Sequence, residues 1–118
     1  MPKYFSGYDP DQLRGNTESM LLFLIDELEQ TYGYRIIKEI ERRSGGFFRF
    51  KEGTVYPALR KLENEGLLKG EWKKLRGGQE RRYYRVTAKG KEVLQKKLAM
   101  WHNFARAMEL IFNPAAAG

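Results

Sequence analysis

Apolar residues recur at helical spacing in the first half of the chain and predict three helices. We expect these helices over residues 16–30, 34–43 and 53–66, with Asn16 as the N-cap of the first. Glycines close the second and third helices. The positions expected to face the core are Met20, Leu21, Leu24, Ile25, Leu28, Tyr34, Ile37, Ile40, Val55, Leu59 and Leu62.

Two extended segments follow the third helix. Residues 67–74 and 81–86 are joined by a short segment with Gly77 and Gly78 at its centre. Adjacent glycines supply the positive φ angles of a tight turn, so the pattern predicts a β-hairpin.

The last helix carries a heptad pattern. Thr87 is placed to cap it, and the apolar positions from Leu94 to Phe112 step by 4, 3, 4, 3 and 4 residues. A second apolar row, which includes Phe104, makes the stripe wider than one small domain needs to cover, so we expect a homodimer. The residues assigned to its interface are Leu94, Leu98, Trp101, Phe104, Ala105, Met108 and Phe112.

The first fifteen residues hold Tyr4, Phe5 and Tyr8 among polar and turn-forming residues. Asp9 before Pro10 is typical of a single capped helical turn. The three aromatic residues indicate that part of this arm docks on another surface.

Composition restricts the class of protein. A chain of 118 residues with 42% apolar residues suits one globular domain. It has no cysteine and a single histidine, His102, which removes disulfides, thiolate metal sites, cysteine nucleophiles and the serine triad. We therefore expect no catalytic residues, no metal and no cofactor.

Hydropathy argues against a membrane protein. The longest apolar run, from Met20 to Ile25, is six residues long. A membrane span needs about 17 or more, and the first sixteen residues do not resemble a signal peptide. We expect a cytoplasmic protein with no membrane partner.

Basic residues are concentrated in the hairpin region. Nine basic and two acidic residues lie between Lys69 and Lys91, a net charge of +7 that equals the net charge of the whole chain. A basic chain favours a polyanionic partner such as nucleic acid or an acidic membrane surface, and basic residues gathered on a hairpin that follows three helices favour double-stranded DNA. The order of three helices, hairpin and long helix then indicates a winged helix-turn-helix, in which the third helix enters the major groove.

The chain accordingly divides into four parts. Residues 1–15 are an N-terminal arm, 16–86 the DNA-binding domain, 87–112 the dimerisation helix and 113–118 a tail. The expected fold class is α+β, mainly helical with a small β-hairpin wing: a winged helix-turn-helix domain plus a long C-terminal dimerisation helix.

Two sequence blocks resemble the PadR family of transcriptional regulators. GTVYPALRKLENEGLL, at 53–68, is followed by a Gly-Gly turn and by RRYYRVTAKG, at 81–90. The resemblance covers nearly everything from Asn16 to Phe112. It implies a repressor that binds palindromic operator DNA as a homodimer, through the third helix and the wing, with possible release by a small aromatic effector.

The resemblance also assigns roles to positions. The residues that match DNA-contacting positions of the family are Tyr34, Thr54, Tyr56, Pro57, Arg60, Lys61, Arg76, Arg81 and Arg82. For Tyr34, packing is the favoured role and a phosphate contact the alternative. The alternative to a DNA contact for Tyr56 is a half-buried position in the core. The alternative for the basic residues is exposure to solvent without a binding role.

Two further residues take their interpretation from the family. Pro57 lies past the first helical turn and removes one backbone hydrogen bond, so we expect a bent or tightened first turn. Trp101 matches a tryptophan that, in multidrug-sensing relatives, lines an apolar cavity and stacks on planar aromatic ligands. An ordinary tryptophan of the dimer core is the alternative.

Other function classes compete with a ligand-modulated repressor. A sequence-tolerant architectural DNA-binding protein would use the same basic wing without an effector. A winged-helix interaction module without DNA has no need to concentrate charge on the hairpin. An enzyme is the weakest reading, because the sequence shows no phosphate loop, metal cluster or activated nucleophile.

Overall fold

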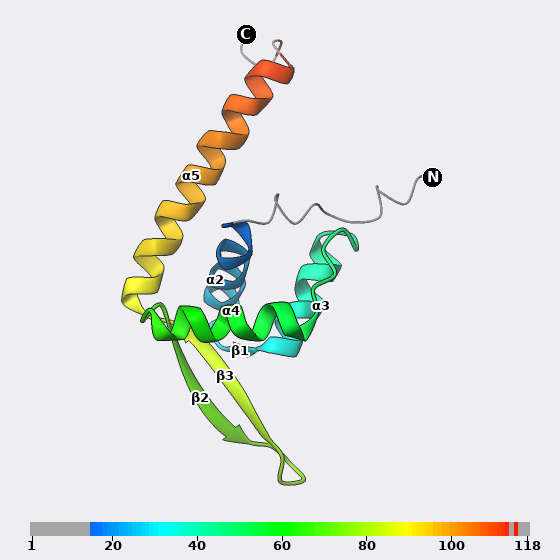
Figure 1. Ribbon diagram of the computed structural model, residues 1–118, viewed down its shortest axis with the longest axis vertical. Coiled ribbons are helices and arrows are strands. Elements are labelled where there is room, and N and C mark those ends of the chain that lie inside the picture. The colour runs from blue at the N-terminus through cyan, green and yellow to red at the C-terminus, as the bar shows by residue number, and fades with distance from the viewer. Residues whose placement is uncertain (1–14, 114, 116–118) are drawn as a thin grey trace.

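The computed structural model describes residues 15–113 and 115, and these residues form four helices and one small antiparallel sheet. The elements are α2 (Asn16–Leu28), β1 (Thr31–Tyr32), α3 (Gly33–Arg43), α4 (Glu52–Asn64), β2 (Leu68–Lys74), β3 (Glu80–Val86) and α5 (Ala88–Phe112). Figure 1 shows α2, α3 and α4 gathered in one unit, with the β2–β3 hairpin projecting from one end and α5 from the other. This architecture confirms the expected α+β winged helix fold with a long last helix.

The core lies between α2, α3 and α4. Val55, Leu59 and Leu62 of α4 are completely buried, as their spacing predicts. Tyr34 departs from the predicted pattern, because its side chain is 56% exposed and Ile36 takes an inward position. The buried apolar residues are Leu21, Leu22, Leu24, Ile25, Ile36, Ile37, Ile40, Phe50, Val55, Leu59, Leu62, Leu67, Leu68, Tyr84 and Leu94.

A third strand joins the predicted hairpin. β1 is two residues long and pairs with β3, which gives the strand order β1-β3-β2. Thr31 lies opposite Tyr84, and Tyr32 lies opposite Tyr83. The expected two-stranded hairpin is therefore corrected to a three-stranded sheet. A two-residue strand contains too little alternation to be recognised from sequence.

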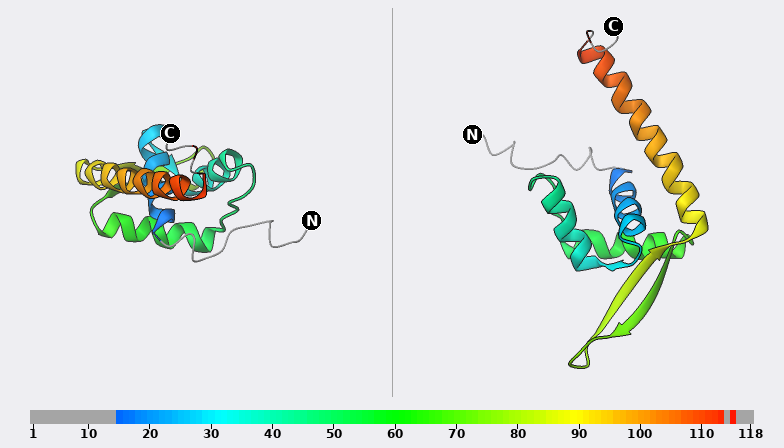
Figure 2. Two further views of the ribbon diagram at one scale, coloured as in Figure 1. Left: turned by 90° about the horizontal axis from the view of Figure 1, so that it is seen from above. Right: turned by 180° about the vertical axis from the view of Figure 1, so that it is seen from behind.

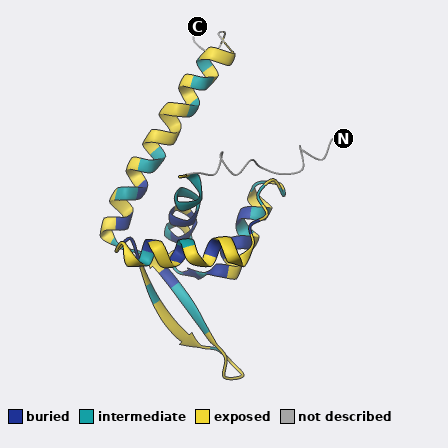
Figure 3. Cartoon of the chain, viewed as in Figure 1, coloured by how far each residue is buried: buried dark blue, intermediate teal, exposed yellow. Residues whose placement is uncertain are grey.

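Strands β2 and β3 and their connecting turn form the wing, residues 68–86. Their register runs from Leu68 opposite Val86 to Lys74 opposite Glu80. Gly77 and Gly78 in the turn have φ angles of 95° and 92°, which residues other than glycine rarely adopt. Figure 3 shows that exposure increases from the base of the wing to its tip.

The ends of α2 differ from the predicted ones. Asn16 is the first helical residue and not the N-cap: Gly15 occupies that position with a φ angle of 84°, and no side chain caps the helix. The helix ends at Leu28 instead of residue 30. Glu29 adopts a φ angle of 68°, which stops the helix and turns the chain toward β1.

The remaining helix boundaries agree more closely with expectation. α3 ends at Arg43 as predicted, and α4 spans Glu52–Asn64 instead of residues 53–66. Gly66 lies beyond the end of α4 with a φ angle of 79°. The turn predicted at Asp9–Pro10 and the docking of the arm fall outside the described residues.

The start of α5 is fastened to the end of α4. Thr87 Oγ1 accepts the backbone N–H of Gly90 at 3.0 Å, which confirms the predicted cap, and donates to the Gly66 carbonyl at 2.7 Å. The backbone N–H of Thr87 donates to the Leu67 carbonyl at 3.1 Å. A Cβ atom at Gly90 would lie 2.2 Å from the same carbonyl oxygen, so only glycine allows this packing. Beyond this junction α5 runs past α2 and away from the other helices, as the right view of Figure 2 shows.

Candidate nucleic-acid interface

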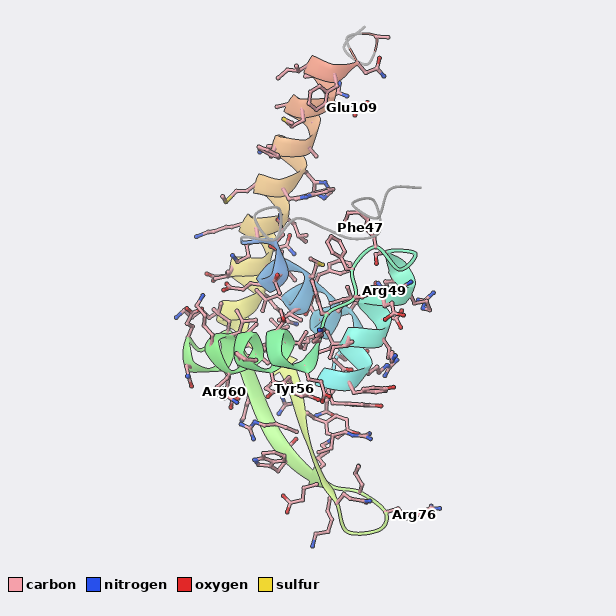
Figure 4. The ribbon with its side chains drawn as sticks, turned by 45° about the vertical axis from the view of Figure 1, so that its right-hand side comes forward. Phe47, Arg49, Tyr56, Arg60, Arg76 and Glu109 are labelled. Atoms are coloured by element: carbon pink, nitrogen blue, oxygen red, sulfur yellow. The ribbon has the colours of Figure 1, made fainter. Side chains whose placement is uncertain are left out.

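The exposed side of α4 carries several of the predicted site residues. Thr54, Tyr56, Pro57 and Arg60 are exposed, and the intervening Val55 and Leu59 are buried. Figure 4 shows the Tyr56 and Arg60 side chains on the side of α4 from which the wing projects. α4 therefore presents hydroxyl, aromatic and guanidinium groups together, next to the wing.

Pro57 lies inside α4 without ending it. In the first turn of the helix, the backbone N–H groups of Thr54 and Val55 both donate to the Lys51 carbonyl, at 2.9 and 3.1 Å. The Lys51 carbonyl therefore accepts one bond over three residues and one over four, which is common at the end of a helix. The bent or tightened first turn expected from Pro57 stays a prediction.

Tyr56 is the aromatic residue of α4. Its side chain is 36% exposed, and its ring lies against Gly33 at the start of α3. Burial raises the pKa of the Tyr56 hydroxyl, and a hydrogen bond with Glu52 raises it further. The hydroxyl is therefore protonated at neutral pH, and its single O–H donates to the Glu52 carboxylate.

One side of the wing carries a stack of alternating cations and tyrosines. The Arg81 guanidinium lies 3.9 Å from the Tyr32 ring centroid, and its Nη1 donates to the Tyr83 hydroxyl at 3.3 Å. Lys73 Nζ lies 5.1 Å from the Tyr83 ring centroid and donates to Gln30 Oε1 at 2.8 Å. These contacts hold the wing to β1 and to the end of α2.

The other side of the wing is fastened to α4. Arg82 forms an ion pair with Glu63, and its guanidinium lies 5.4 Å from the Trp72 ring centroid and 5.8 Å from that of Tyr84. The bond to Glu63 raises the pKa of Arg82. Sequence analysis did not identify Glu63 or Trp72, because their proximity depends on how the wing packs against the helix.

A hollow of about 910 Å³ lies between α4, the start of α3 and the wing. The structure brings five predicted site residues together around it, namely Tyr34, Tyr56, Arg60, Arg81 and Arg82. Thr54, Pro57, Lys61 and Arg76 do not line it. Arg76 lies at the tip of the wing, away from α4 (Figure 4).

Lys61 makes its contacts away from this hollow. Its ammonium group pairs with Glu18 of α2 and lies 3.5 Å from Glu65. The bond to Glu18 raises the pKa of Lys61. The Glu18 carboxylate also lies 3.8 Å from Lys97 Nζ, so one acidic residue connects α2 with both α4 and α5.

The predicted dimer residues divide along α5. Leu94 is buried and Leu98 packs against the core, whereas Trp101, Phe104 and Phe112 are 51%, 65% and 71% exposed. The intermediate positions are Ala105 and Met108. The outer part of α5 thus exposes large apolar side chains that the described residues do not cover.

A second hollow of about 440 Å³ lies between the start of α2 and α5. Met100, Trp101 and Phe104 form its apolar side, and Asn16, Ser19 and Lys97 supply polar groups. Trp101 therefore borders a concave surface within one chain.

Residues 15–113 and 115 contain no group of three or more His, Asp or Glu side chains placed to hold a metal ion. In the same part of the chain, no helix is long and apolar enough to cross a membrane.

Comparison with known proteins gives consistent similarities. Residues 21–96 match the sequence pattern of the transcriptional regulator PadR-like family. An uncharacterized protein X of Lysinibacillus sphaericus is 33% identical over 103 residues, which cover 87% of this chain and 94% of the relative. A transcriptional regulator from Clostridium thermocellum has a similar structure, with a TM-score of 0.77 and 27% identity over 86% of this chain and 95% of that one. Bacillus subtilis PadR, solved in complex with operator DNA, has a TM-score of 0.64 and 27% identity over 70% of this chain and 46% of that one.

Proposed function

This chain belongs to the PadR-like family of transcriptional regulators, and from that premise we propose that it is a repressor that binds a palindromic DNA operator as a homodimer. Its family and fold are those of DNA-binding regulators and not of enzymes. In the proposed complex, α4 enters the major groove and the wing contacts the flanking backbone or minor groove.

The observation that carries this proposal is the joint surface of α4 and the wing. Tyr56 and Arg60 lie on the side of α4 nearest the wing, and Arg76 lies at the wing tip (Figure 4). Arg60 and Arg76 make no hydrogen bond or ion pair with another described residue, so both guanidinium groups are available to DNA. An arginine can bond two acceptors of guanine in the major groove or neutralise a phosphate.

The other predicted contact residues support this surface in different ways. Thr54 and Pro57 are exposed near the start of α4, where a hydroxyl can meet a phosphate oxygen. Tyr34 is exposed at the start of α3. We propose that Lys61, Arg81 and Arg82, which are engaged within the chain, contribute mainly by orienting the surface.

Titration of DNA at several salt concentrations tests the proposal. The operator is first selected from a random duplex library by the wild-type protein. We expect Arg60→Ala to weaken operator binding selectively, and Arg76→Ala to weaken all sequences and to flatten the salt dependence. Lys96→Ala, which removes the same charge from α5, is the matched control. Unchanged binding in both arginine variants would falsify the assignment of this surface.

The same titration separates the repressor from an architectural DNA-binding protein. A specific regulator binds its operator about 10³-fold or more tighter than unrelated duplex. A ratio near one would favour the architectural alternative, which needs no effector.

We also propose that α5 forms the homodimer interface. Trp101, Phe104 and Phe112 expose large apolar surfaces along one stripe, and such surfaces on soluble proteins mark association sites. The heptad spacing of this stripe suits the packing of two helices against each other.

We further propose that a planar aromatic effector binds beside Trp101. The hollow beside Trp101 has a volume within the usual range for small ligands, and its methionine and phenylalanine adapt to flat molecules. Titration of flat dyes, flavins and phenolic acids into a Trp72→Phe variant should quench the remaining Trp101 fluorescence to saturation. A Trp101→Phe variant is the control, and absence of saturable quenching would remove the effector from the proposal.

A further inference from the structure

Arg82 occupies a fixed position between the wing and α4. Its guanidinium pairs with the Glu63 carboxylate and lies against the Trp72 and Tyr84 rings, at 5.4 and 5.8 Å from their centroids. The Arg82 and Glu63 side chains are each 27% exposed, so the pair is shielded from water on most sides. A charge-assisted bond in such a setting is stronger than one between fully exposed groups.

Gly70 makes room for this arrangement. It lies on β2 opposite Tyr84, diagonally across the ladder from Arg82. A Cβ atom at Gly70 would come within 2.7 to 2.8 Å of three atoms of the Arg82 guanidinium. The guanidinium therefore passes over the bare backbone of β2 on its way to α4.

Glu63 also has a defined relation to the residue expected to read DNA. It follows Arg60 by three residues, and residues at this spacing are neighbours on a helix surface. Both residues line the hollow between α4 and the wing. The bond from Glu63 to Arg82 thus fixes the base of the wing next to Arg60.

The pair has a consequence for DNA binding. The Glu63 carboxylate offsets the charge that Arg82 would otherwise bring to a phosphate, whereas Arg60 and Arg76 have no such partner among the described residues. Phosphate contacts are the source of sequence-independent affinity, because each one releases counterions from the duplex. A masked arginine on the wing removes one such contact.

We propose that Glu63 is a specificity-determining residue, which withholds Arg82 from the phosphates of unrelated DNA and fixes the wing relative to α4. This inference rests on the proposed function, since it assumes that α4 and the wing are the DNA-binding surface. It predicts an unusual result: loss of an acidic residue raises non-specific affinity and lowers specificity.

Binding of labelled DNA to Glu63→Gln tests the proposal. On a duplex of scrambled sequence at low salt, we expect affinity several-fold higher than that of the wild type. One added phosphate contact should steepen the slope of log K against log salt by about 0.9. The specificity ratio between the selected operator and the scrambled duplex should fall.

Two further variants isolate the role of Arg82. Arg82→Gln should leave the salt slope of the wild type unchanged, because Arg82 makes no phosphate contact in the native protein. The double variant Glu63→Gln/Arg82→Gln should lose the gain of the single variant. A flatter slope in Arg82→Gln would overturn the proposal, because it would place Arg82 on phosphate in the wild type.

Glu71→Gln serves as the matched control for net charge. Glu71 is exposed on β2 and forms no hydrogen bond or ion pair with another described residue. Its substitution removes the same negative charge from the wing and leaves the Glu63–Arg82 pair intact. If Glu71→Gln gains as much non-specific affinity, the effect of Glu63→Gln comes from overall charge alone, and the proposal is refuted.

A measurement without DNA separates failure of the inference from failure of the proposed function. In a Trp101→Phe background Trp72 is the only tryptophan, because the chain has two. Glu63→Gln should change the Trp72 emission, since Arg82 leaves its ring, and circular dichroism should show an intact fold. If the wild type binds no DNA, the proposed function fails whatever Trp72 reports. If DNA binding follows the proposed function and neither Trp72 emission nor the salt slope responds to Glu63→Gln, the inference alone fails.

Discussion

The ring of Tyr56 on α4 lies directly against Gly33, the first residue of α3. A Cβ atom at Gly33 would come within 2.1 Å of Tyr56 Cε1 and 2.9 Å of Cδ1. The absence of a side chain at Gly33 therefore sets the position of an aromatic residue on the proposed DNA-binding surface.

Gly33→Ala should move the Tyr56 ring and strain the contact between α3 and α4. We expect a loss of stability of about 1 to 3 kcal/mol, typical of overpacking, and weaker operator binding. Urea unfolding and DNA titration measure the two effects. Gly53→Ala is the control, because a Cβ atom there meets nothing within 4 Å. The double variant Gly33→Ala/Tyr56→Ala should recover part of the lost stability; further destabilisation would contradict the steric explanation.

Arg60 and Lys61 are adjacent in sequence, and their substitution should have different consequences. Arg60→Ala should cost about 1 to 3 kcal/mol of operator affinity if its guanidinium bonds a guanine. Lys61→Ala should affect DNA binding much less, because Lys61 is paired with Glu18 and Glu65. Mobility-shift titrations of the two variants decide the matter, and equal losses would show that Lys61 leaves its partners to bind DNA.

Phe104→Glu should dissociate the proposed dimer. Phe104 is 65% exposed in a single chain, so its replacement spares the core and places a charge in the expected interface. Ala99→Glu adds the same charge to the opposite side of α5 and should leave the dimer intact. Light scattering at micromolar concentration measures both. A monomeric wild type, or a dimeric Phe104→Glu variant, would exclude this interface.

Loss of the Glu39 contribution should lower the stability of the protein as the pH becomes acidic. Hydrogen bonds from Arg42 and Arg43 lower the pKa of Glu39 from an ordinary value of 4.5 to about 2. Because the unfolded chain binds the proton more readily, this contribution is complete above about pH 4.5 and is lost as the pH falls toward 2.

Urea unfolding between neutral pH and pH 2 compares the wild type with Glu39→Gln. The variant should be less stable at neutral pH, and the difference should shrink through this acidic range. Glu41→Gln, on the same helix, controls for loss of a carboxylate. A difference that grows with acidity would be inconsistent with the lowered pKa.

Local pattern was sufficient to predict much of the fold. The buried face of α4, with Val55, Leu59 and Leu62, follows from spacing alone, and the Thr87 hydroxyl caps α5 as its position predicts. The paired glycines of the wing likewise adopt the positive φ angles of a turn. Each of these features depends on residues close together in the chain.

Features that depend on distant residues were missed. β1 depends on pairing with β3, which lies about fifty residues later in the chain. The positive φ angle of Glu29 ends α2 early and directs the chain into β1. The ion pair of Lys61 with Glu18 joins residues that are 43 positions apart. The Glu63–Arg82 pair spans 19 residues and requires the wing to fold back along α4. These contacts depend on tertiary packing, so they cannot be predicted from the spacing of apolar residues along the chain.

The hydrogen bonds of Thr87 to the Gly66 and Leu67 carbonyls fix the direction of α5 relative to the end of α4. With 25 residues at about 1.5 Å each, α5 is roughly 37 Å long. If two copies pivot near the far end of α5, a rotation of only about 5° displaces the fastened end by about 3 Å, by the same length. In dimeric helix-turn-helix proteins the two recognition helices stand about 34 to 36 Å apart, so a displacement of this size is comparable to the rise of one base pair. The length of α5 thus turns a small angle at its distal end into a shift of several ångströms at the end that is bonded to Gly66 and Leu67.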